Sequence, residues 1–322
     1  MRNFLPASGT TVFVAVIALF LAITAPGQVS LREAMDTDGD NKADYTVFRP
    51  SDNVWYIAKS GGGFTFQNFG IANEDFMTPG DYDGDNKGDI SVWRDTTGVW
   101  YRLNSSNNTF VANAWGITGD EPVARDYDGD GKTDLAVVRR TNGAMIWYVL
   151  RSLDGGFVAV QFGLSSDYIA PGDYDGDLKF DFAIQRPGAS ANAQGTFYIQ
   201  RSSDGNFDVV TWGLSNDLVV PGDYDGDGKT DIAIVREGTT PTSNLVWWIR
   251  RSSDAGVFAA TFGITGTDLN VQNDYDADGK TDLAIWRNSD GRFYVLRSTD
   301  NGLGVVQWGI PNDFPVASYD SH

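Results

Sequence analysis

A single unit recurs six times along the chain, and this repetition constrains the fold more than any other feature. Each copy opens with a loop rich in aspartate, and neighbouring loops start about 45 to 51 residues apart. The loops begin at Asp36, Asp81, Asp126, Asp173, Asp223 and Asp274. A repeat of this length is typical of propellers and solenoids, in which each unit buries its apolar face against the next.

Within each repeat, four short apolar runs are separated by turn residues. The first run follows the Asp-rich loop and ends in arginine, as in residues 135–139 (LAVVR), and the second opens with an aromatic pair. The third ends in Phe-Gly or Trp-Gly, and the fourth starts with Asp and leads into the next loop. Short β-branched and aromatic runs between turn residues predict strands. Four strands per repeat make one blade of a β-propeller, so we expect an all-β fold.

The two ends of the chain predict how the ring closes. Residues 313–318 (DFPVAS) match the innermost strand of a blade but have no blade after them, whereas residues 30–35 (SLREAM) match poorly. We therefore predict six four-stranded blades, with the C-terminal strand closing the first blade. Closure of this kind leaves few free sheet edges. Seven blades is the alternative, although it requires a further complete blade.

The first 27 residues differ from the repeats. Arg2 precedes an apolar run over residues 12–23, and Ala25-Pro26-Gly27 follows it. The run is too short for a transmembrane helix but typical of a signal peptide. We predict a signal peptide over 1–27, cleavage near Gly27, and a single propeller domain over 28–322. The protein would be secreted or at the cell surface, extracellular or periplasmic, without membrane insertion after cleavage; an uncleaved anchor is the alternative.

The Asp-rich loop has the composition of a calcium site. In residues 126–134 (DYDGDGKTD), carboxylates occupy positions one, three, five and nine. Ca²⁺ takes six to eight oxygen ligands, and alternating Asp residues in a tight turn can converge on one ion. Gly or Asn at position six permits a left-handed backbone, and Lys at position seven would offer its carbonyl oxygen while its ammonium stays in solvent.

The same positions in all six loops form the predicted ligand set. It comprises Asp36, Asp38, Asp40, Lys42 and Asp44; Asp81, Asp83, Asp85, Lys87 and Asp89; Asp126, Asp128, Asp130, Lys132 and Asp134; Asp173, Asp175, Asp177, Lys179 and Asp181; Asp223, Asp225, Asp227, Lys229 and Asp231; and Asp274, Asp276, Asp278, Lys280 and Asp282.

Calcium fits these loops better than magnesium or no ion. Mg²⁺ demands a small octahedron and keeps its waters, and bare loops would place four carboxylates close together six times over. We expect up to six Ca²⁺ ions. The site at Asp173–Asp181 is the least certain, because Leu178 stands where the other loops have Gly or Asn; Ala277 replaces Gly at position four of the sixth loop.

Charge and composition narrow the partners. The formal net charge is −19, which disfavours nucleic acid and anionic lipid. The chain has no Cys, and its single His is the last residue, His322. Thiolate nucleophiles, Cys-based zinc sites and His-dependent triads are therefore disfavoured. The expected partner is an extracellular protein or glycan.

Several motifs together resemble a known family. They are the Phe-Gly and Trp-Gly pairs, the PGDYDGD stretches at 171–177 and 221–227, and the apolar run after position nine. On these motifs nearly all of residues 30–320 resembles the FG-GAP/VCBS repeats of integrin α-chain propellers, bacterial surface proteins and some fungal lectins. The resemblance implies a propeller with calcium between the first and second strands of each blade. It implies adhesion or sugar binding without fixing a partner, and some members are joined to enzymes.

An arginine recurs five residues after the closing Asp of each loop, at the end of the blade away from the loop. Six such arginines could form a ring that binds an anion. The Asp that opens each fourth run lies at the same end, however, so we expect six structural ion pairs. The pairs are Asp75 with Arg94, Asp120 with Arg139, Asp167 with Arg186, Asp217 with Arg236, Asp268 with Arg287, and Asp313 with Arg49.

The recurring aromatic residues are expected to pack. One member of each aromatic pair, such as Trp147-Tyr148, should fill the space between blades, although stacking on sugar rings is an alternative. Tyr at loop position two, as in Tyr127, should also pack rather than bind the ion.

These observations favour a calcium-binding module for adhesion to protein or carbohydrate. A lectin for a specific sugar is a narrower alternative. A polysaccharide-cleaving enzyme with a carboxylate pair is a third hypothesis. We expect that the chain is not an enzyme, because every recurring carboxylate already has a metal or ion-pair role.

Overall fold

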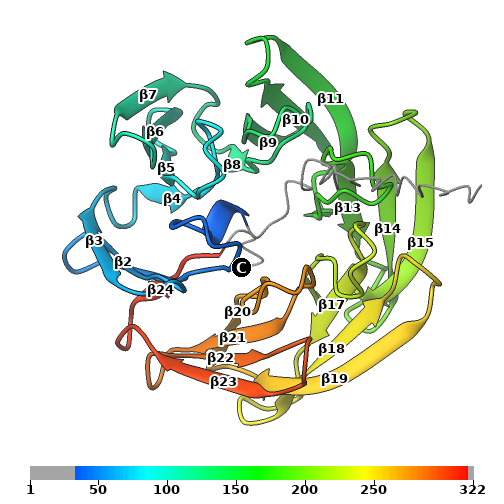
Figure 1. Cartoon of the computed structure of the whole chain (residues 1–322). Helices are drawn as coiled ribbons and strands as arrows, with labels where there is room; N and C mark the ends of the chain where they lie inside the picture. Colours follow the sequence, from blue (N-terminus) through cyan, green and yellow to red (C-terminus); the bar gives the residue numbers. More distant parts are fainter. Residues whose placement is uncertain (1–32, 318–322) are drawn as a thin grey trace, which may run out of the picture.

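The computed structural model describes residues 33–317, which form six four-stranded antiparallel sheets arranged as blades around a central axis (Figure 1). This is a six-bladed β-propeller, as predicted from the repeat. In five blades the strands follow one another along the chain from the axis to the rim, and the Asp-rich loop joins the innermost strand to the second. In the first blade the innermost strand comes from the C-terminal end, and the Asp-rich loop leads from η1 (Glu33–Met35) into the second strand.

The strands of each blade are given from the axis outward. The first blade has β24 (Phe314–Pro315), β1 (Tyr45–Arg49), β2 (Val54–Ala58) and β3 (Phe64–Asn68). The second has β4 (Asp75–Met77), β5 (Ile90–Arg94), β6 (Val99–Leu103) and β7 (Phe110–Ala114). The third has β8 (Glu121–Pro122), β9 (Leu135–Thr141), β10 (Ala144–Leu150) and β11 (Phe157–Leu164).

The remaining blades repeat this order. The fourth has β12 (Tyr168–Ile169), β13 (Phe182–Arg186), β14 (Gln194–Gln200) and β15 (Phe207–Leu214). The fifth has β16 (Leu218–Val219), β17 (Ile232–Arg236), β18 (Asn244–Arg250) and β19 (Val257–Ile264). The sixth has β20 (Asp268–Asn270), β21 (Leu283–Arg287), β22 (Arg292–Leu296) and β23 (Leu303–Gln307).

The core lies at the seams between blades. Buried apolar residues form six clusters, and each cluster joins residues of two neighbouring blades. The second strands are buried on both faces, and the third strands alternate between buried and half-buried residues. Tryptophans such as Trp93, Trp147 and Trp247 are fully buried there. Large side chains are needed because flat sheets that diverge from an axis leave wide gaps between them.

The C-terminal strand closes the ring. β24 pairs with β1 through Val47 with Pro315 and Phe48 with Phe314. At the other end of the described chain, Glu33–Met35 forms a short 3-10 helix, η1, instead of a strand. Closure of the first blade by the C-terminal strand is therefore confirmed, and the seven-bladed alternative is wrong.

The predicted signal peptide, residues 1–27, lies outside the described residues. Within residues 33–317, the structure contains no helix with the length and apolar character needed to cross a membrane.

Candidate metal centres

Backbone hydrogen bonds join the six Asp-rich loops into a ring. The N–H at position eight of each loop donates to the carbonyl of the position-one Asp in the preceding loop. These bonds are Gly88 to Asp36, Thr133 to Asp81, Phe180 to Asp126, Thr230 to Asp173, Thr281 to Asp223 and Ala43 to Asp274, at 2.6 to 2.8 Å. Because the last bond connects the first loop to the sixth, the ring has no open end.

The position-one Asp shapes each loop. In the third loop, Asp126 Oδ1 accepts the N–H of Gly129 at 2.6 Å, and Oδ2 accepts the N–H of Gly131 at 3.0 Å. The position-five Asp130 accepts the N–H of Lys132, and the closing Asp134 accepts the N–H of Tyr127. The other five loops make the same bonds at the same positions. The carboxylates at positions one, five and nine are thereby held within one turn of chain.

The turn requires left-handed backbone at two positions, of which the sequence analysis identified one. Positions four and six both have positive φ in every loop. Glycine or asparagine adopts this conformation at little cost, whereas other L-residues are strained in it. Leu178 at position six has φ of 72°, and Ala277 at position four has φ of 64°. Leu178 nevertheless donates its N–H to Asp173 Oδ2 at 2.9 Å, so the fourth loop keeps its shape.

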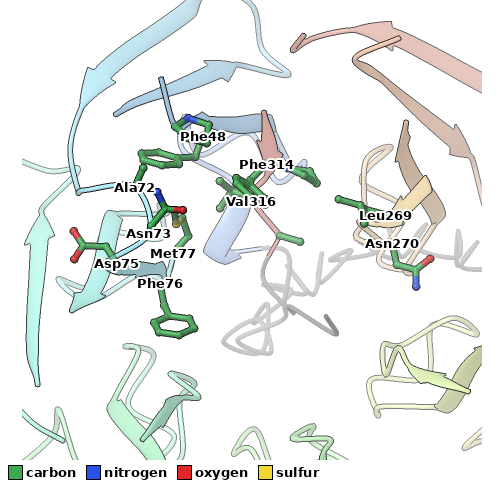
Figure 2. A pocket seen from close by; sticks show the side chains of 13 residues that line it. Phe48, Ala72, Asn73, Asp75, Phe76, Met77, Leu269, Asn270, Phe314 and Val316 are labelled. Atoms are coloured by element: carbon green, nitrogen blue, oxygen red, sulfur yellow. The ribbon is translucent and has the colours of Figure 1, made fainter. Parts of the chain in front are cut away.

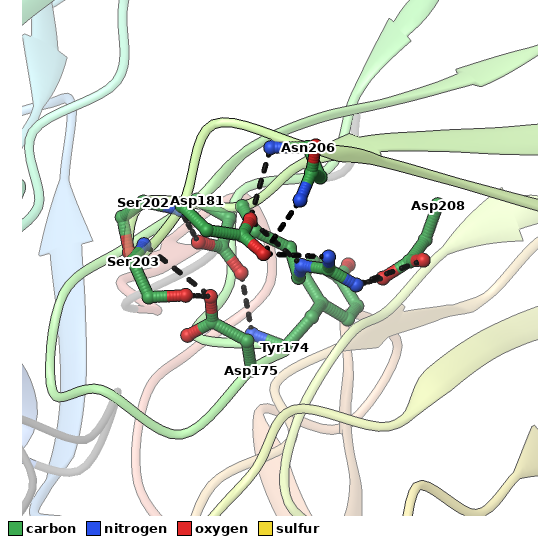
Figure 3. A network of polar contacts seen from close by, with 9 residues as sticks. Tyr174, Asp175, Asp181, Ser202, Ser203, Asn206 and Asp208 are labelled. Carbon is green, nitrogen blue, oxygen red and sulfur yellow. Dashed lines mark hydrogen bonds and ion pairs between the residues drawn. The ribbon is translucent and has the colours of Figure 1, made fainter.

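A serine after the third strand completes each site, and the sequence analysis did not identify it. In the fourth blade, Ser202 donates its N–H to Asp181 Oδ1 at 2.7 Å and its hydroxyl to Asp177 Oδ1 at 2.8 Å. Ser203 donates its hydroxyl to Asp175 Oδ2, as Figure 3 shows. Equivalent serines recur in the other blades; they are Ser60, Ser105, Ser152, Ser252 and Ser298. The signal was available in the sequence, because the recurring turn reads Arg-Ser-X-Asp in four of the blades.

The loops contain oxygens with no protein donor. Within the described residues, six groups of three acidic side chains can each bring one oxygen per residue within 4.8 Å of one another. At position three, Oδ1 of four residues is buried and accepts no hydrogen bond from the described chain: Asp38, Asp83, Asp175 and Asp276. A buried carboxylate oxygen without a donor is costly unless a cation binds it. The residues therefore fit a hard cation that prefers oxygen ligands.

Burial and mutual repulsion perturb the carboxyl groups. Burial, together with the charge of Asp128, raises the pKa of Asp134 to about 7. Burial likewise raises the pKa of Asp181 to about 7 and of Asp89, Asp231 and Asp282 to about 6. Each closing Asp is thus harder to ionise than a free carboxyl group. A bound cation would lower these pKa values again, because it favours the ionised form.

The position-seven lysines reach across to the neighbouring loop. A Cβ added at Gly84 would lie 2.7 Å from Lys132 Cε, and one added at Gly226 would lie 2.9 Å from Lys280 Cε. The lysine stem therefore covers the position-four glycine of the preceding loop. That the backbone carbonyl of this lysine binds the ion remains a prediction.

The six predicted Asp–Arg ion pairs are confirmed. In the third blade, Arg139 Nε lies 2.7 Å from Asp120 Oδ1, and its Nη2 lies 2.9 Å from Oδ2. The other five predicted pairs are also present, and the shortest distance in each is 2.7 to 2.8 Å. The carboxylates are almost fully buried. Each guanidinium carbon also lies 4.0 to 5.7 Å from the ring centre of the second member of the aromatic pair in its blade, such as Tyr148 in the third blade.

The aromatic residues pack as predicted. The first member of each aromatic pair is at most 1 % exposed in all six blades. The position-two tyrosines donate their hydroxyls to a backbone carbonyl four residues earlier, as Tyr127 does to Val123 at 2.8 Å. The six arginines are therefore paired with carboxylates and do not form a free anion-binding ring. The position-two tyrosines pack and hydrogen-bond to the backbone.

The chain is similar to solved structures at low sequence identity. No protein-family profile and no curated protein sequence matches it. It is similar to a mutant of AofleA from Arthrobotrys oligospora, with 9 % identity, 90 % of each chain covered and a TM-score of 0.51. A luciferin-regenerating enzyme shares 8 % identity over 73 % of this chain and 78 % of that chain, with a TM-score of 0.40. The dihydro-heme d1 dehydrogenase NirN shares 11 % over 88 % and 54 %, with a TM-score of 0.35.

The comparison corrects one expectation. We expected that the chain is not an enzyme, yet two of these similar structures are enzymes, so that exclusion is wrong. The physical reason is that a propeller is a scaffold, and catalysis depends on individual side chains placed on it. Accounting for the carboxylates that recur in every blade does not account for residues that occur once. At these identities the similarity describes the fold alone and assigns no activity.

Proposed function

We propose that this protein is a calcium-stabilised β-propeller that acts outside the cytoplasm as a binding or adhesion module for protein or carbohydrate. The observation that carries the proposal is the ring of six carboxylate-rich loops, in four of which a buried position-three oxygen has no donor in residues 33–317. Carboxylates and backbone carbonyls are the ligands that Ca²⁺ prefers, at six to eight per ion.

The net charge of the chain supports the proposal that the protein needs calcium to fold. Six divalent ions would carry a charge of +12 against the formal net charge of −19, leaving about −7. If free calcium stood at tenfold the dissociation constant, each site would add roughly 1.4 kcal/mol to the free energy of unfolding, and six independent sites about 8 kcal/mol. This equals the whole stability of an ordinary domain.

The test is calcium binding by isothermal titration after removal of bound metal with a chelator. We expect that wild-type protein binds several Ca²⁺ ions and that Asp128→Asn binds one ion fewer, because it neutralises a position-three ligand. Asp208→Asn is the matched control, since it removes the same charge from an exposed pair with Arg201. The proposal is wrong if calcium neither binds nor raises the melting temperature.

Exposed aromatic rings favour a lectin as the second candidate. The outermost strands of four blades begin with phenylalanines that are more than half exposed: Phe64, Phe110, Phe157 and Phe207. Phe64 stacks on Trp308 of the sixth blade with ring centres 5.0 Å apart. Such rings present a free face at a seam, on which a sugar can stack.

A glycan array with the calcium-loaded protein separates these candidates. Binding to defined sugars that Phe64→Ala or Phe157→Ala weakens would support the lectin, whereas a blank array leaves a protein partner. An assay for released reducing ends on the same glycans tests the third hypothesis, cleavage by a carboxylate pair.

A further inference from the structure

The axial cavity of the propeller offers few polar groups to a ligand. It has a volume of about 380 Å³ and lies between strands of the first, second and sixth blades (Figure 2). Its lining is mostly apolar, and Asp75, the one ionisable residue among the described residues that line it, has both oxygens bound to Arg94. The amide of Asn270 is buried and turned away from the aromatic side chains. The groups that can bind an ion therefore lie at the Asp-rich loops and not in this cavity.

The third and fifth loops form a natural matched pair. Residues 126–134 and 223–231 share the sequence DYDGDGKTD. Their position-one aspartates accept the same two N–H groups, at 2.6 and 3.0 Å in the third loop and 2.6 and 2.9 Å in the fifth. Ser152 and Ser252 contact the closing and position-five aspartates through the same bonds. A difference between the two sites must then come from residues outside the loop.

The two sites differ at the residue that follows this serine. In the fifth blade, Ser253 donates its hydroxyl to Oδ2 of the position-three Asp225 at 2.5 Å. In the third blade the same place is taken by Leu153, whose backbone N–H donates to Asp128 Oδ2 at 3.2 Å. Hydroxyl bonds to a carboxylate are short, about 2.5–2.7 Å, and roughly twice as strong as bonds between neutral groups. The position-three carboxylate is therefore held more firmly in the fifth site than in the third.

The same residue sorts the six blades into two groups. In four blades a hydroxyl binds the position-three Asp at 2.5 to 2.6 Å; the donors are Ser106, Ser203, Ser253 and Thr299. Figure 3 shows this contact between Ser203 and Asp175. The first blade has Gly61 at this place, which donates its backbone N–H to Asp38 Oδ2 at 3.2 Å. The first and third blades thus have the weaker contact.

This contact matters because the position-three Asp is a predicted ligand. The hydroxyl binds Oδ2 and leaves Oδ1 for the ion, and in four loops Oδ1 is buried without a donor from the described residues. Hydrogen bonds to a ligating carboxylate orient it, and loss of such a bond typically weakens metal binding by about 10- to 100-fold. A carboxylate that is already oriented also loses less freedom when the ion binds. A site with the hydroxyl should therefore bind more tightly.

We propose that the residue after this serine sets the calcium affinity of each loop. The second, fourth, fifth and sixth sites bind Ca²⁺ about tenfold more tightly than the first and third. As free calcium falls, the first and third loops lose their ions before the other four. This proposal rests on the proposed function, because it concerns ions in the same loops, and it distinguishes sites that the repeat alone would make equivalent.

The test follows the amide resonances of Gly131 and Gly228 in heteronuclear NMR spectra of the full chain during a calcium titration. Both glycines donate their N–H to the position-one Asp, so each reports on its own loop. We expect that Gly228 responds at about tenfold lower free calcium than Gly131. Equal midpoints would overturn this proposal and leave the proposed function intact, whereas no response to calcium would overturn both.

Reciprocal variants assign the difference to one hydroxyl. Leu153→Ser should tighten the third site about tenfold, and Ser253→Leu should weaken the fifth by the same factor. Leu153→Ala and Ser253→Thr are the matched controls, because the first adds no hydroxyl and the second keeps one, as Thr299 does in the sixth blade. Both positions are exposed, so all four variants should fold. Unchanged midpoints in the reciprocal variants, or equal shifts in the controls, would contradict the proposal.

Discussion

At the scale of single residues, the Asp-rich loop depends on two left-handed positions rather than on carboxylates alone. The position-one Asp can accept the N–H groups of positions four and six only when both residues turn back towards it. Leucine at position 178 therefore holds an unfavourable backbone conformation within an otherwise regular loop. The hydrogen bonds of the loop overcome that strain, which makes the fourth site a place where one substitution should improve the protein.

We predict that Leu178→Gly stabilises the protein. Relief of left-handed strain is worth about 1–2 kcal/mol, and the greater freedom of glycine in the unfolded chain offsets about 0.5–1 kcal/mol. The net gain should be up to about 1 kcal/mol in the free energy of unfolding, measured by chemical denaturation in calcium. Gly228→Leu, the reverse change at the same position of the fifth loop, should destabilise the protein. If the two variants shift stability in the same direction, the strain argument is wrong.

At the scale of elements, each blade is tied together at both ends. At one end, the Asp-rich loop joins the innermost strand to the second in five blades and leads from η1 to the second strand in the first blade. At the other end, the Asp that opens the innermost strand binds the arginine that ends the second, and also accepts an N–H from the connection that follows the outermost strand. In the third blade these are Asp120, Arg139 and Ile117. The short strand β8 has only two residues, so this pair does much to hold it in register.

We predict that Asp120→Asn lowers the free energy of unfolding by about 1.5–3 kcal/mol, because it removes charge-assisted hydrogen bonds from a buried carboxylate. Asp154→Asn is the control, since Asp154 forms an exposed i,i+3 pair with Arg151 and such pairs contribute at most about 1 kcal/mol. Denaturant unfolding of both variants in calcium gives the comparison. Equal effects would show that the buried pair has no special role.

At the scale of the whole molecule, the ring of loops concentrates negative charge at one end of the propeller. Burial raises the pKa of the closing Asp residues to about 6 or 7, above the ordinary value of 3.8. The folded chain without calcium therefore binds more protons than the unfolded chain between about pH 4 and pH 7. Its stability must fall as the pH rises through that window.

Calcium should reverse this dependence on pH. Ligand carboxylates bind the ion when ionised, so protons compete with calcium below about pH 7. We predict that the melting temperature in a chelator is lower at pH 8 than at pH 5.5, and that the increase caused by calcium is larger at pH 8. Scanning calorimetry at the two pH values, with and without calcium, measures both differences. If calcium raises the melting temperature by the same amount at both pH values, the prediction is wrong.

The sequence by itself determined the repeat, the strand order, the six blades and the six Asp–Arg pairs. These features follow from regular spacing: equivalent residues of a repeat occupy equivalent places, so one motif such as residues 126–139 defines its five copies. The acidic loops were predictable for the same reason, because alternating aspartates in a short turn can point only to a common centre.

Only the tertiary structure decided what happens between segments far apart in the chain. The serines that hold the carboxylates, the bonds from each loop to the next, and the lysine stems over neighbouring glycines depend on how the blades curve around the axis. The same holds for Asn270, whose two amide atoms are buried without a hydrogen-bond partner in the described part of the chain. Local sequence specifies each blade, but ring closure, a long-range event, determines which groups meet and which are left without a partner.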